Sequence, residues 1–307
     1  MEEILQFKLS IEDKINIGLL ILILYGIIEM AYLYFFKKYE GMRDYRQTTM
    51  NFGFVVILNM VVSSLIGVVS TSAFSLWAYE YSIFHADLSW FWWIIGLLVY
   101  EFFYWLQHWL AHKVRFLWCL HSPHHAPESM NMFVGFNHHF LETMIYMPFF
   151  LGFIPSLVGI NPIIILTIAF VDIMWGNLLH INDKIMTKKY GLIEKILQTP
   201  SYHRVHHAQN VRYMDTNFNS ITLFWDWALG TLQPLDDQEK VKFGITRDVD
   251  SSSFWDVQFG EFVLLMKDVM SVSSWKDKFL YLVMPPGWSH TGEHKTVSVL
   301  KKTLDNN

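Results

Sequence analysis

The residues of this sequence that are best suited to chemistry are its histidines. Of 14 histidines in 307 residues, 11 lie in five short segments. In chain order the segments contain His108 and His112; His121, His124 and His125; His138 and His139; His180; and His203, His206 and His207. Imidazole is the usual nitrogen ligand of Zn, Cu, Fe and Ni, and a metal site needs several such nitrogens to converge on one point. The clustering therefore predicts a metal centre.

The spacing within the first and last segments predicts this convergence. His108 and His112 are four residues apart and so share one face of a helix. Before the last segment, Thr199 is expected to cap a helix that has Pro200 at its first position. On such a helix the three histidines of residues 203–207 lie on one arc and point the same way.

The second segment repeats the H-x-x-H-H spacing but includes a proline. Pro123 disfavours a helical conformation at Ser122. We therefore expect a helix to begin between His121 and the adjacent pair that follows it, with the preceding loop directing the first imidazole.

The number of histidines exceeds what one ion needs, since a structural zinc ion takes four protein ligands and a catalytic one takes three plus water. We therefore predict two ions in a nitrogen-rich dinuclear centre with few carboxylates. Successive helix residues do not easily bind one ion, so of the adjacent His138 and His139 we predict His139 and leave His138 open. The predicted ligands are His108, His112, His121, His124, His125, His139, His180, His203, His206 and His207.

The elements that must position these ligands have the composition of a membrane protein, with 52% hydrophobic and 17% charged residues. A spanning helix needs roughly 20 apolar residues. The longest of four apolar stretches contains Pro155, Gly159 and Pro162, and we expect a hairpin there. The sequence thus predicts an all-α, polytopic integral membrane protein with about four membrane-embedded helical segments. These segments are residues 15–36, 52–78, 90–106 and 144–179.

The distribution of basic residues predicts the side on which the histidines lie. Four basic residues follow the first apolar stretch, whereas residues 79–89 contain no Lys or Arg. The positive-inside rule then places a helical cap with the histidines in the cytoplasm. The isolated His85, His290 and His294 are expected to be amphipathic residues at an interface. The basic residues are Lys37, Lys38, Arg43 and Arg46.

The predicted organisation has three parts. Residues 1–89 form an N-terminal transmembrane region, residues 90–235 a catalytic domain, and residues 236–307 a cytoplasmic or membrane-surface extension. The N-terminus lacks signal-peptide features, so the first apolar stretch is expected to stay in the mature protein. Because no retention signal is present, we favour the bacterial inner membrane over the endoplasmic reticulum.

Several classes of function are excluded by composition. The single cysteine, Cys119, rules out an internal disulfide and any thiolate zinc or iron–sulfur cluster. The formal charge of -5, without a basic run interleaved with aromatics, argues against nucleic acid as a partner. The sequence also lacks a Gly-rich dinucleotide fingerprint and a haem-binding C-x-x-C-H motif.

The order and spacing of the histidine motifs resemble the fatty acid hydroxylase and sterol desaturase superfamily, from about residue 90 to 234. The last motif and Pro285-Pro286-Gly287-Trp288 are similar to its alkylglycerol-monooxygenase-like branch. Trp109 and Phe140 depart from the family pattern, where Arg and Pro are common, but neither change removes a ligand. The motifs are Tyr104-Trp105-x-x-His108-x-x-x-His112, Leu117-Trp118-x-x-His121-x-x-His124-His125, His139-x-x-Glu142 and Thr199-Pro200-x-x-His203-Arg204-Val205-His206-His207.

The resemblance implies a di-iron enzyme that uses O2 to hydroxylate a C–H bond of a lipid of the fatty acyl, alkyl ether or sterol-like kind. Zinc could replace the two Fe ions in purified protein. Because the chain has no redox motif of its own, a separate electron-donor protein is implied. The expected residues around the ligands are Glu101, Glu142, Asp172 and Asp226, with Asp183 and Asp215 as further candidates.

Three other functions stay open at this point. A desaturase or ketolase would use the same metal centre. A zinc-dependent membrane hydrolase would use Glu142 or Glu101 as general base, although no H-E-x-x-H motif is present. A non-catalytic metal carrier or transporter would place its ligands near the bilayer midplane instead of at one end of the helices. The lipid, the carbon oxidised, the electron donor and the oligomeric state are not predicted.

Overall fold

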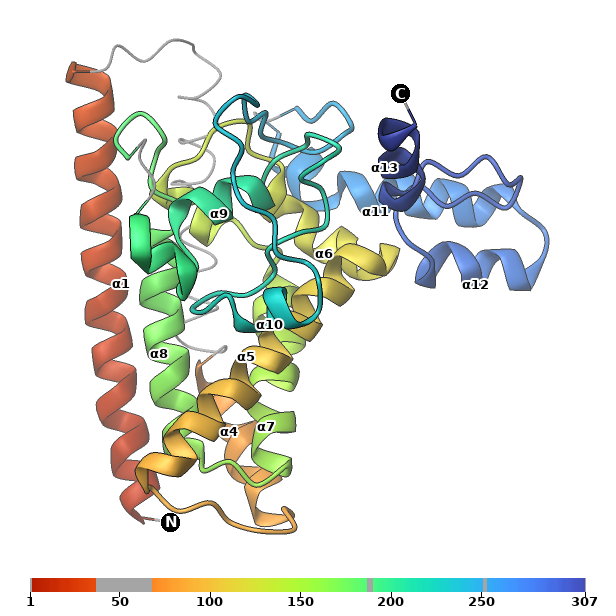
Figure 1. Ribbon diagram of the computed structural model, residues 1–307. Coiled ribbons are helices and arrows are strands. Elements are labelled where there is room, and N and C mark those ends of the chain that lie inside the picture. Colours follow the sequence, from red (N-terminus) through yellow and green to blue (C-terminus); the bar gives the residue numbers. More distant parts are fainter. Residues whose placement is uncertain (1, 37–67, 187–189, 251–252, 307) are drawn as a thin grey trace.

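The computed structural model describes residues 2–36, 68–186, 190–250 and 253–306, and these residues form helices without any β-strand (Figure 1). The all-α prediction is confirmed for this part of the chain. The α-helices are α1 (Glu2–Phe36), α4 (Val68–Glu80), α5 (Trp90–Lys113), α6 (Arg115–His125), α7 (Ile154–Leu157), α8 (Pro162–Leu178), α9 (Pro200–His206), α10 (Phe224–Ala228), α11 (Phe254–Ser271), α12 (Trp275–Val283) and α13 (Val297–Asp305). The 3-10 helices are η3 (Met132–Phe136) and η6 (Gly191–Lys195), and the π-helices are η4 (Glu142–Tyr146) and η5 (Phe149–Phe153).

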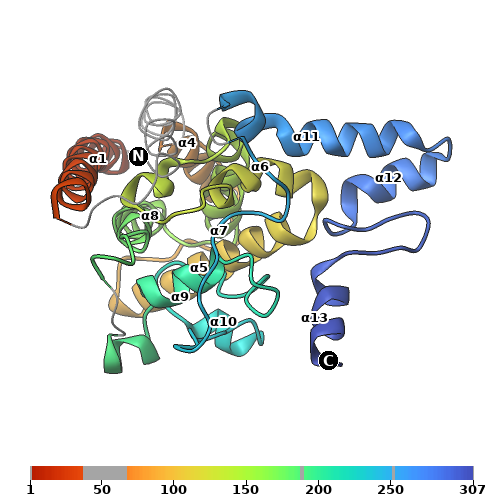
Figure 2. The same cartoon turned by 90° about the horizontal axis from the view of Figure 1, so that it is seen from above.

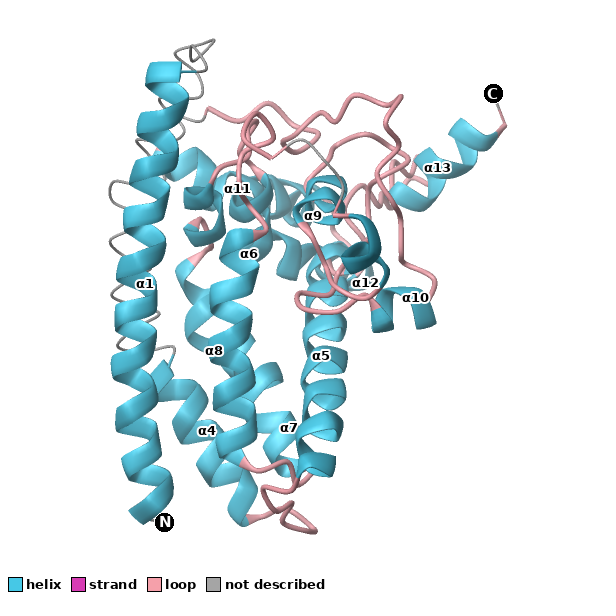
Figure 3. Ribbon diagram, turned by 60° about the vertical axis from the view of Figure 1, so that its left-hand side comes forward, coloured by secondary structure: helices cyan, strands magenta, loops and turns pink. Residues whose placement is uncertain are grey.

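Helices α1, α4, α5, α7 and α8 run side by side as a bundle, and α6 and α9 cover one end of it (Figures 1 and 3). We call this end the histidine end. The bundle core packs Tyr100 of α5 against Leu151 of η5 and Ile164 of α8. Close packing of α5 on α8 requires a small residue, because a Cβ at Gly96 would lie 2.5 Å from the Ile164 side chain. This packing carries the ends of α5 and α8, with their histidines, to the same end of the bundle.

The long apolar stretch of residues 144–179 reverses direction as expected. Gly159 has a φ of 111°, a conformation that favours glycine, and the chain turns there (Figure 1). The returning helix α8 begins at Pro162, and the side chain of Asn161 caps it by accepting a hydrogen bond of 3.0 Å from the Ile163 N–H.

The prediction of a polytopic membrane protein is wrong for the part of the chain that the structure describes. None of its helices combines the length and the apolar character that crossing a bilayer demands. Helix α8 has only 17 residues and contains Asp172, and α5 combines its apolar start with Glu101. The predicted segment at residues 52–78 lies outside the described residues up to residue 67.

Two local predictions also need correction. Helix α6 does not begin after His121 but runs from Arg115 through Pro123, which lies in its last turn, where few hydrogen bonds are lost. Helix α9 begins at Pro200 as predicted, but the Thr199 side chain does not cap it. The Thr199 hydroxyl instead donates to Glu194 at 3.1 Å.

Helices α11, α12 and α13 extend to one side of the bundle (Figure 2). Helices α11 and α12 pack on α6, where Cys119 is buried with Leu265, Val272 and Tyr281. Burial raises the pKa of the Cys119 thiol to about 12, so the thiol stays neutral and serves packing. The predicted boundaries at residues 89 and 235 stay predictions.

Candidate metal centre

Nine buried histidines form two groups at the histidine end of the bundle. In each group every histidine has one ring nitrogen that lies within 4.8 Å of the corresponding nitrogens of the others. The five-histidine group consists of His108, His112, His121, His125 and His206, and the four-histidine group of His124, His180, His203 and His207. Five and four make nine, so the structure brings together all but one of the ten predicted ligands.

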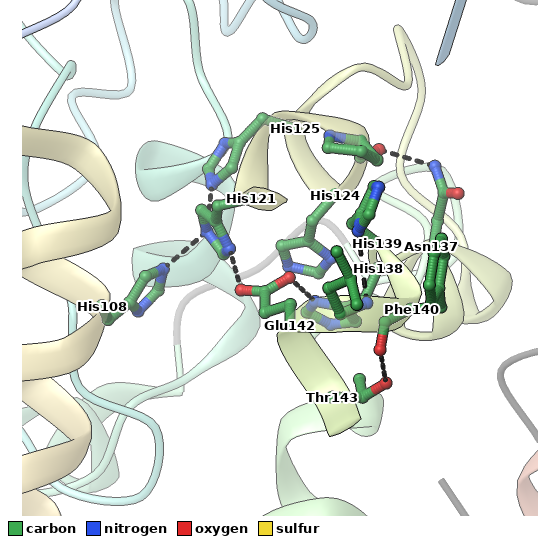
Figure 4. Close-up of polar contacts among 12 residues, drawn as sticks. His108, His121, His124, His125, Asn137, His138, His139, Phe140, Glu142 and Thr143 are labelled. Atoms are coloured by element: carbon green, nitrogen blue, oxygen red, sulfur yellow. Dashed lines mark hydrogen bonds and ion pairs between the residues drawn. The ribbon is translucent and has the colours of Figure 1, made fainter. Parts of the chain in front are cut away.

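The distances between ring nitrogens fit ligands of a shared ion. In the five-histidine group, Nε2 of His121 lies 3.0 Å from Nε2 of His108 and 3.2 Å from Nε2 of His125 (Figure 4). In the four-histidine group, Nε2 of His180 lies 2.9 Å from Nε2 of His203 and 3.3 Å from Nε2 of His124. Two nitrogens about 2.1 Å from one ion and at right angles around it are about 3.0 Å apart.

The hydrogen bonds on the other ring nitrogens show why a cation belongs there. Nδ1 of His108 donates to the Phe218 carbonyl at 2.7 Å, and Nδ1 of His121 faces the Glu142 carboxylate at 2.7 Å. With protons on Nδ1, the two facing Nε2 atoms both present lone pairs, which repel each other unless a cation binds them. Nε2 of His206 is buried and has no hydrogen-bond partner among the described residues, while its Nδ1 donates to the Thr216 carbonyl at 2.8 Å.

The histidines are held in the neutral form that binds metals. Burial, followed by the proximity of other imidazoles, lowers the pKa of His108, His112 and His125 well below the ordinary value. In the four-histidine group, burial lowers the pKa of His180 to about 3. A neutral ring offers its lone pair without first losing a proton, so both groups fit metal ions.

Adjacent histidines serve different groups. His124 and His207 belong to the four-histidine group, whereas their neighbours His125 and His206 belong to the five-histidine group. Successive residues of a helix point about 100° apart, so an H-H pair aims its two rings at two places. The three histidines of residues 203–207 therefore do not serve one ion together, as their shared arc had suggested.

Residues 215–222, which we call the orienting loop, hold the rings of the five-histidine group. Besides the Phe218 and Thr216 carbonyls, this loop provides Asp215, whose Oδ1 lies 3.5 Å from Nδ1 of His112. Asp226 fixes the loop by accepting from the Phe218 N–H at 2.8 Å, and Glu101 by accepting from the Thr222 N–H at 2.8 Å.

The four predicted surrounding acids thus have different contacts. Glu142 contacts the histidines directly; burial alone would raise its pKa, but the neighbouring His121 and His138 outweigh this and lower the pKa to about 2. Glu101 and Asp226 contact the orienting loop and no predicted ligand. Asp172 accepts from the Tyr100 hydroxyl at 2.8 Å, and burial raises its pKa to about 6.

The pair His138 and His139 is arranged differently from the prediction. The His139 ring contacts Phe140 and the side chains of α11, away from both groups (Figure 4). The His138 ring stacks on His124 at a centroid distance of 4.2 Å, and its Nδ1 lies 2.9 Å from Glu142. The four-residue spacing of His138 and Glu142 was the sequence signal for this contact.

A cavity of about 210 Å³ adjoins both groups. His108 and His121 of the five-histidine group line it, as do three members of the four-histidine group. Away from the histidines its walls are mainly apolar and include Met147, Leu151 and Leu166. The cavity can accept part of an alkyl chain and bring it next to the metal site.

The fold and the site together define a helical protein with a buried, histidine-rich candidate metal centre beside an apolar cavity. Residues 93–231 match the fatty acid hydroxylase family model. Residues 93–231 therefore form a domain of the fatty acid hydroxylase family, and the chain is similar to the alkylglycerol-monooxygenase-like branch of that family.

Named relatives agree with this assignment. The chain is 30% identical over 207 residues to an alkylglycerol monooxygenase of Danio rerio, which covers 66% of this chain and 44% of the relative. It is 29% identical over 224 residues to that of Homo sapiens (71% and 47%), and 31% identical over 157 residues to an ornithine lipid hydroxylase of Rhizobium tropici (51% and 46%). The chain thus spans less than half the length of these relatives. No solved structure matches significantly.

Proposed function

We propose that this protein is a lipid monooxygenase that uses two iron ions, one in each histidine group, and O2 to hydroxylate a C–H bond. The observation that carries the proposal is that both histidine groups line one largely apolar cavity. Nitrogen-rich sites suit redox metals such as iron, and an apolar cavity suits an alkyl chain. The names of the relatives, which refer to alkylglycerols and an ornithine lipid, support a fatty acyl, alkyl ether or sterol-like lipid as substrate.

Bound iron would supply the activation of O2 that attack on an unactivated C–H bond requires. The chain itself holds and orients the ligands. The Phe218 carbonyl and the Glu142 carboxylate keep the Nδ1 protons of His108 and His121 in place, which leaves both Nε2 atoms free to bind. Burial of both groups excludes bulk water from the reacting atoms.

We further propose that a separate protein delivers the electrons, since the sequence lacks nucleotide, haem and iron–sulfur motifs. We also propose that the protein works in association with a lipid membrane. Large apolar side chains are exposed along α1, including Ile17 and Ile28, and along α11 and α12, including Met270 and Trp275. The cytoplasmic side and the bacterial inner membrane stay predictions from the sequence.

The test compares the lipids of host cells that express the protein, its His206→Ala variant or the control His85→Ala, each with a reductase supplied. His85 is exposed and lies outside both groups. We expect one lipid class to gain one oxygen with the intact protein and with His85→Ala, but not with His206→Ala. Loss of two hydrogens would indicate a desaturase instead, and identical lipids in all three strains would contradict an oxygenase. Bound zinc, with activity that persists without O2, would favour a hydrolase.

A further inference from the structure

We propose that Gln107, Asn177 and Asn219 form a polar subsite that binds an uncharged hydroxyl or amide group of the substrate. All three side chains line the cavity beside the histidine groups. Each has a buried amide atom without a hydrogen-bond partner: Oε1 of Gln107, Oδ1 of Asn177, and both Oδ1 and Nδ2 of Asn219. Buried polar atoms are rarely left unpaired, so four such atoms on three side chains around one cavity indicate that a ligand pairs with them.

The three amides come from separate elements that fix their positions. Gln107 precedes His108 on α5, and its main-chain carbonyl accepts from the Tyr146 hydroxyl at 2.7 Å. Asn177 lies on α8, where its Nδ2 donates to the Ile173 carbonyl at 2.8 Å.

This bond directs Oδ1 of Asn177 away from its own helix. A Cβ at Gly135, which also lines the cavity, would overlap this Oδ1. Asn219 lies on the orienting loop. Its backbone N–H donates to Asp226 at 2.9 Å, and this hydrogen bond does not use the side-chain amide.

The charges around the cavity select an uncharged group. No Lys or Arg occurs among the described residues that line it. The one carboxylate on the wall, Asp172, already accepts from Tyr100. A phosphate or carboxylate would therefore be buried without a counter-charge, which is costly. On these three side chains, three unpaired acceptors against one unpaired donor favour a group that donates a hydrogen bond, such as a hydroxyl or an amide N–H.

The place of the subsite also selects which part of the substrate reacts. Gln107 adjoins a member of the five-histidine group, and Asn177 lies one turn before His180 of the four-histidine group. Apolar side chains, among them Leu151 and Leu166, line the same cavity. A substrate held by the amides would present a carbon near its polar group to the metal site, with its alkyl chain along the apolar wall. This inference rests on the proposed function for the reaction, but not for the binding.

The experiment measures binding to the metal-loaded protein without reductant and without O2, so that no turnover occurs. The probes are a hexadecyl ether of glycerol with two free hydroxyls and the same ether with both hydroxyls methylated. We expect the dihydroxy probe to bind at least about tenfold more tightly, since a donor lost from a polar site leaves acceptors unpaired. Gln107→Met and Asn219→Leu should each lower this ratio by roughly tenfold. The matched control is Gln258→Met, because Gln258 is also buried with an unpaired amide but lies outside the cavity.

The binding experiment tests the subsite independently of the proposed reaction. The unfolding temperatures show whether the variants are folded. If folded variants keep the affinity ratio of the two probes unchanged, the subsite is overturned and the amides pair with water instead. Failure of the intact protein to bind or distinguish the two probes would also overturn it. A ratio that falls in both variants but not in Gln258→Met would support the subsite even if no lipid were oxidised, and in that case only the proposed monooxygenase activity would fail.

Discussion

The two histidine groups differ in how their rings are held from outside. In the five-histidine group, Nδ1 of His108 and of His206 donates to a carbonyl of the orienting loop, and His121 faces Glu142. In the four-histidine group, Nδ1 of His180 donates to the Gly176 carbonyl at 2.8 Å, but Nδ1 of His124 and of His203 is buried without a hydrogen-bond partner among the described residues. Outer hydrogen bonds fix ring orientation and raise ligand basicity. If each group binds an ion as proposed, we therefore predict that the first group holds its ion more firmly than the second.

The two groups also differ in how many of their rings line the cavity. Three of the four rings in the four-histidine group line the cavity, namely His124, His180 and His203, but only His108 and His121 of the other group do so. Fewer protein ligands also leave more coordination positions for other molecules. The four-histidine group, which we expect to hold its ion less firmly, is thus also the group with more rings on the cavity. Access from the cavity is what a site that exchanges small ligands requires.

The largest effect should come from removing adjacent ligands that belong to different groups. We expect His206→Ala and His207→Ala each to lower activity by about 100-fold or more. Their metal contents should differ, because His206→Ala leaves four histidines in its group whereas His207→Ala leaves three. Metal analysis should find His207→Ala to have lost more bound metal. Equal losses of bound metal in the two variants would contradict a difference in metal affinity between the groups.

Removal of metal from the intact protein should proceed in two steps. A chelator titration, followed by metal analysis and by residual activity, should remove the ion of the four-histidine group first. Outer-shell contacts change metal affinity by about 10–100-fold, so we expect the two steps to be separated by roughly that factor in chelator concentration. A single step that removes both ions together would contradict the comparison.

Glu142→Gln should weaken the firmly held group selectively. The amide cannot replace the carboxylate that faces both His121 and His138, so we expect metal affinity of the five-histidine group to fall by about 10–100-fold. In the chelator titration the two steps should then move together. The matched control is Glu293→Gln, because Glu293 is exposed and distant in sequence from both histidine groups. In this variant the two steps of the chelator titration should stay apart.

The sequence predicted the ligands better than their division. The spacings of four residues at His108 and His112, and of three and four in H-x-x-H-H, express helix geometry directly, and the structure gathers these residues. The carbonyls of Phe218 and Thr216 could not be predicted, because backbone groups leave no trace in residue type. The membrane prediction failed for the described residues because apolar runs also fill a bundle core: Ile164, for example, is fully buried against α5.

The smallest effect concerns a contact from α1 that supports the four-histidine group. The Glu29 carboxylate accepts from the Met132 N–H and the Asn182 N–H, both at 2.7 Å, and so holds the segment that follows His180. Burial, outweighing these two hydrogen bonds, raises the pKa of Glu29 to about 7 from 4.5. The native state therefore keeps a proton that the unfolded chain loses. Stability from this group is complete below pH 4.5 and is lost as the pH rises to about 7, by roughly 3 kcal/mol in total.

Glu29→Gln removes this titration but retains an acceptor for only one of the two N–H groups. We expect the variant to be less stable than the parent by about 1 kcal/mol at pH 5, and the difference to vanish or reverse by pH 8. Denaturant unfolding of both proteins from pH 5 to 8 measures this, and histidine titration cancels because both proteins share it. The control Glu293→Gln should show no such pH-dependent difference. If the difference between Glu29→Gln and the parent is constant with pH, then Glu29 is already ionised in the folded protein, and α1 holds the His180 segment through a charged group at every pH tested.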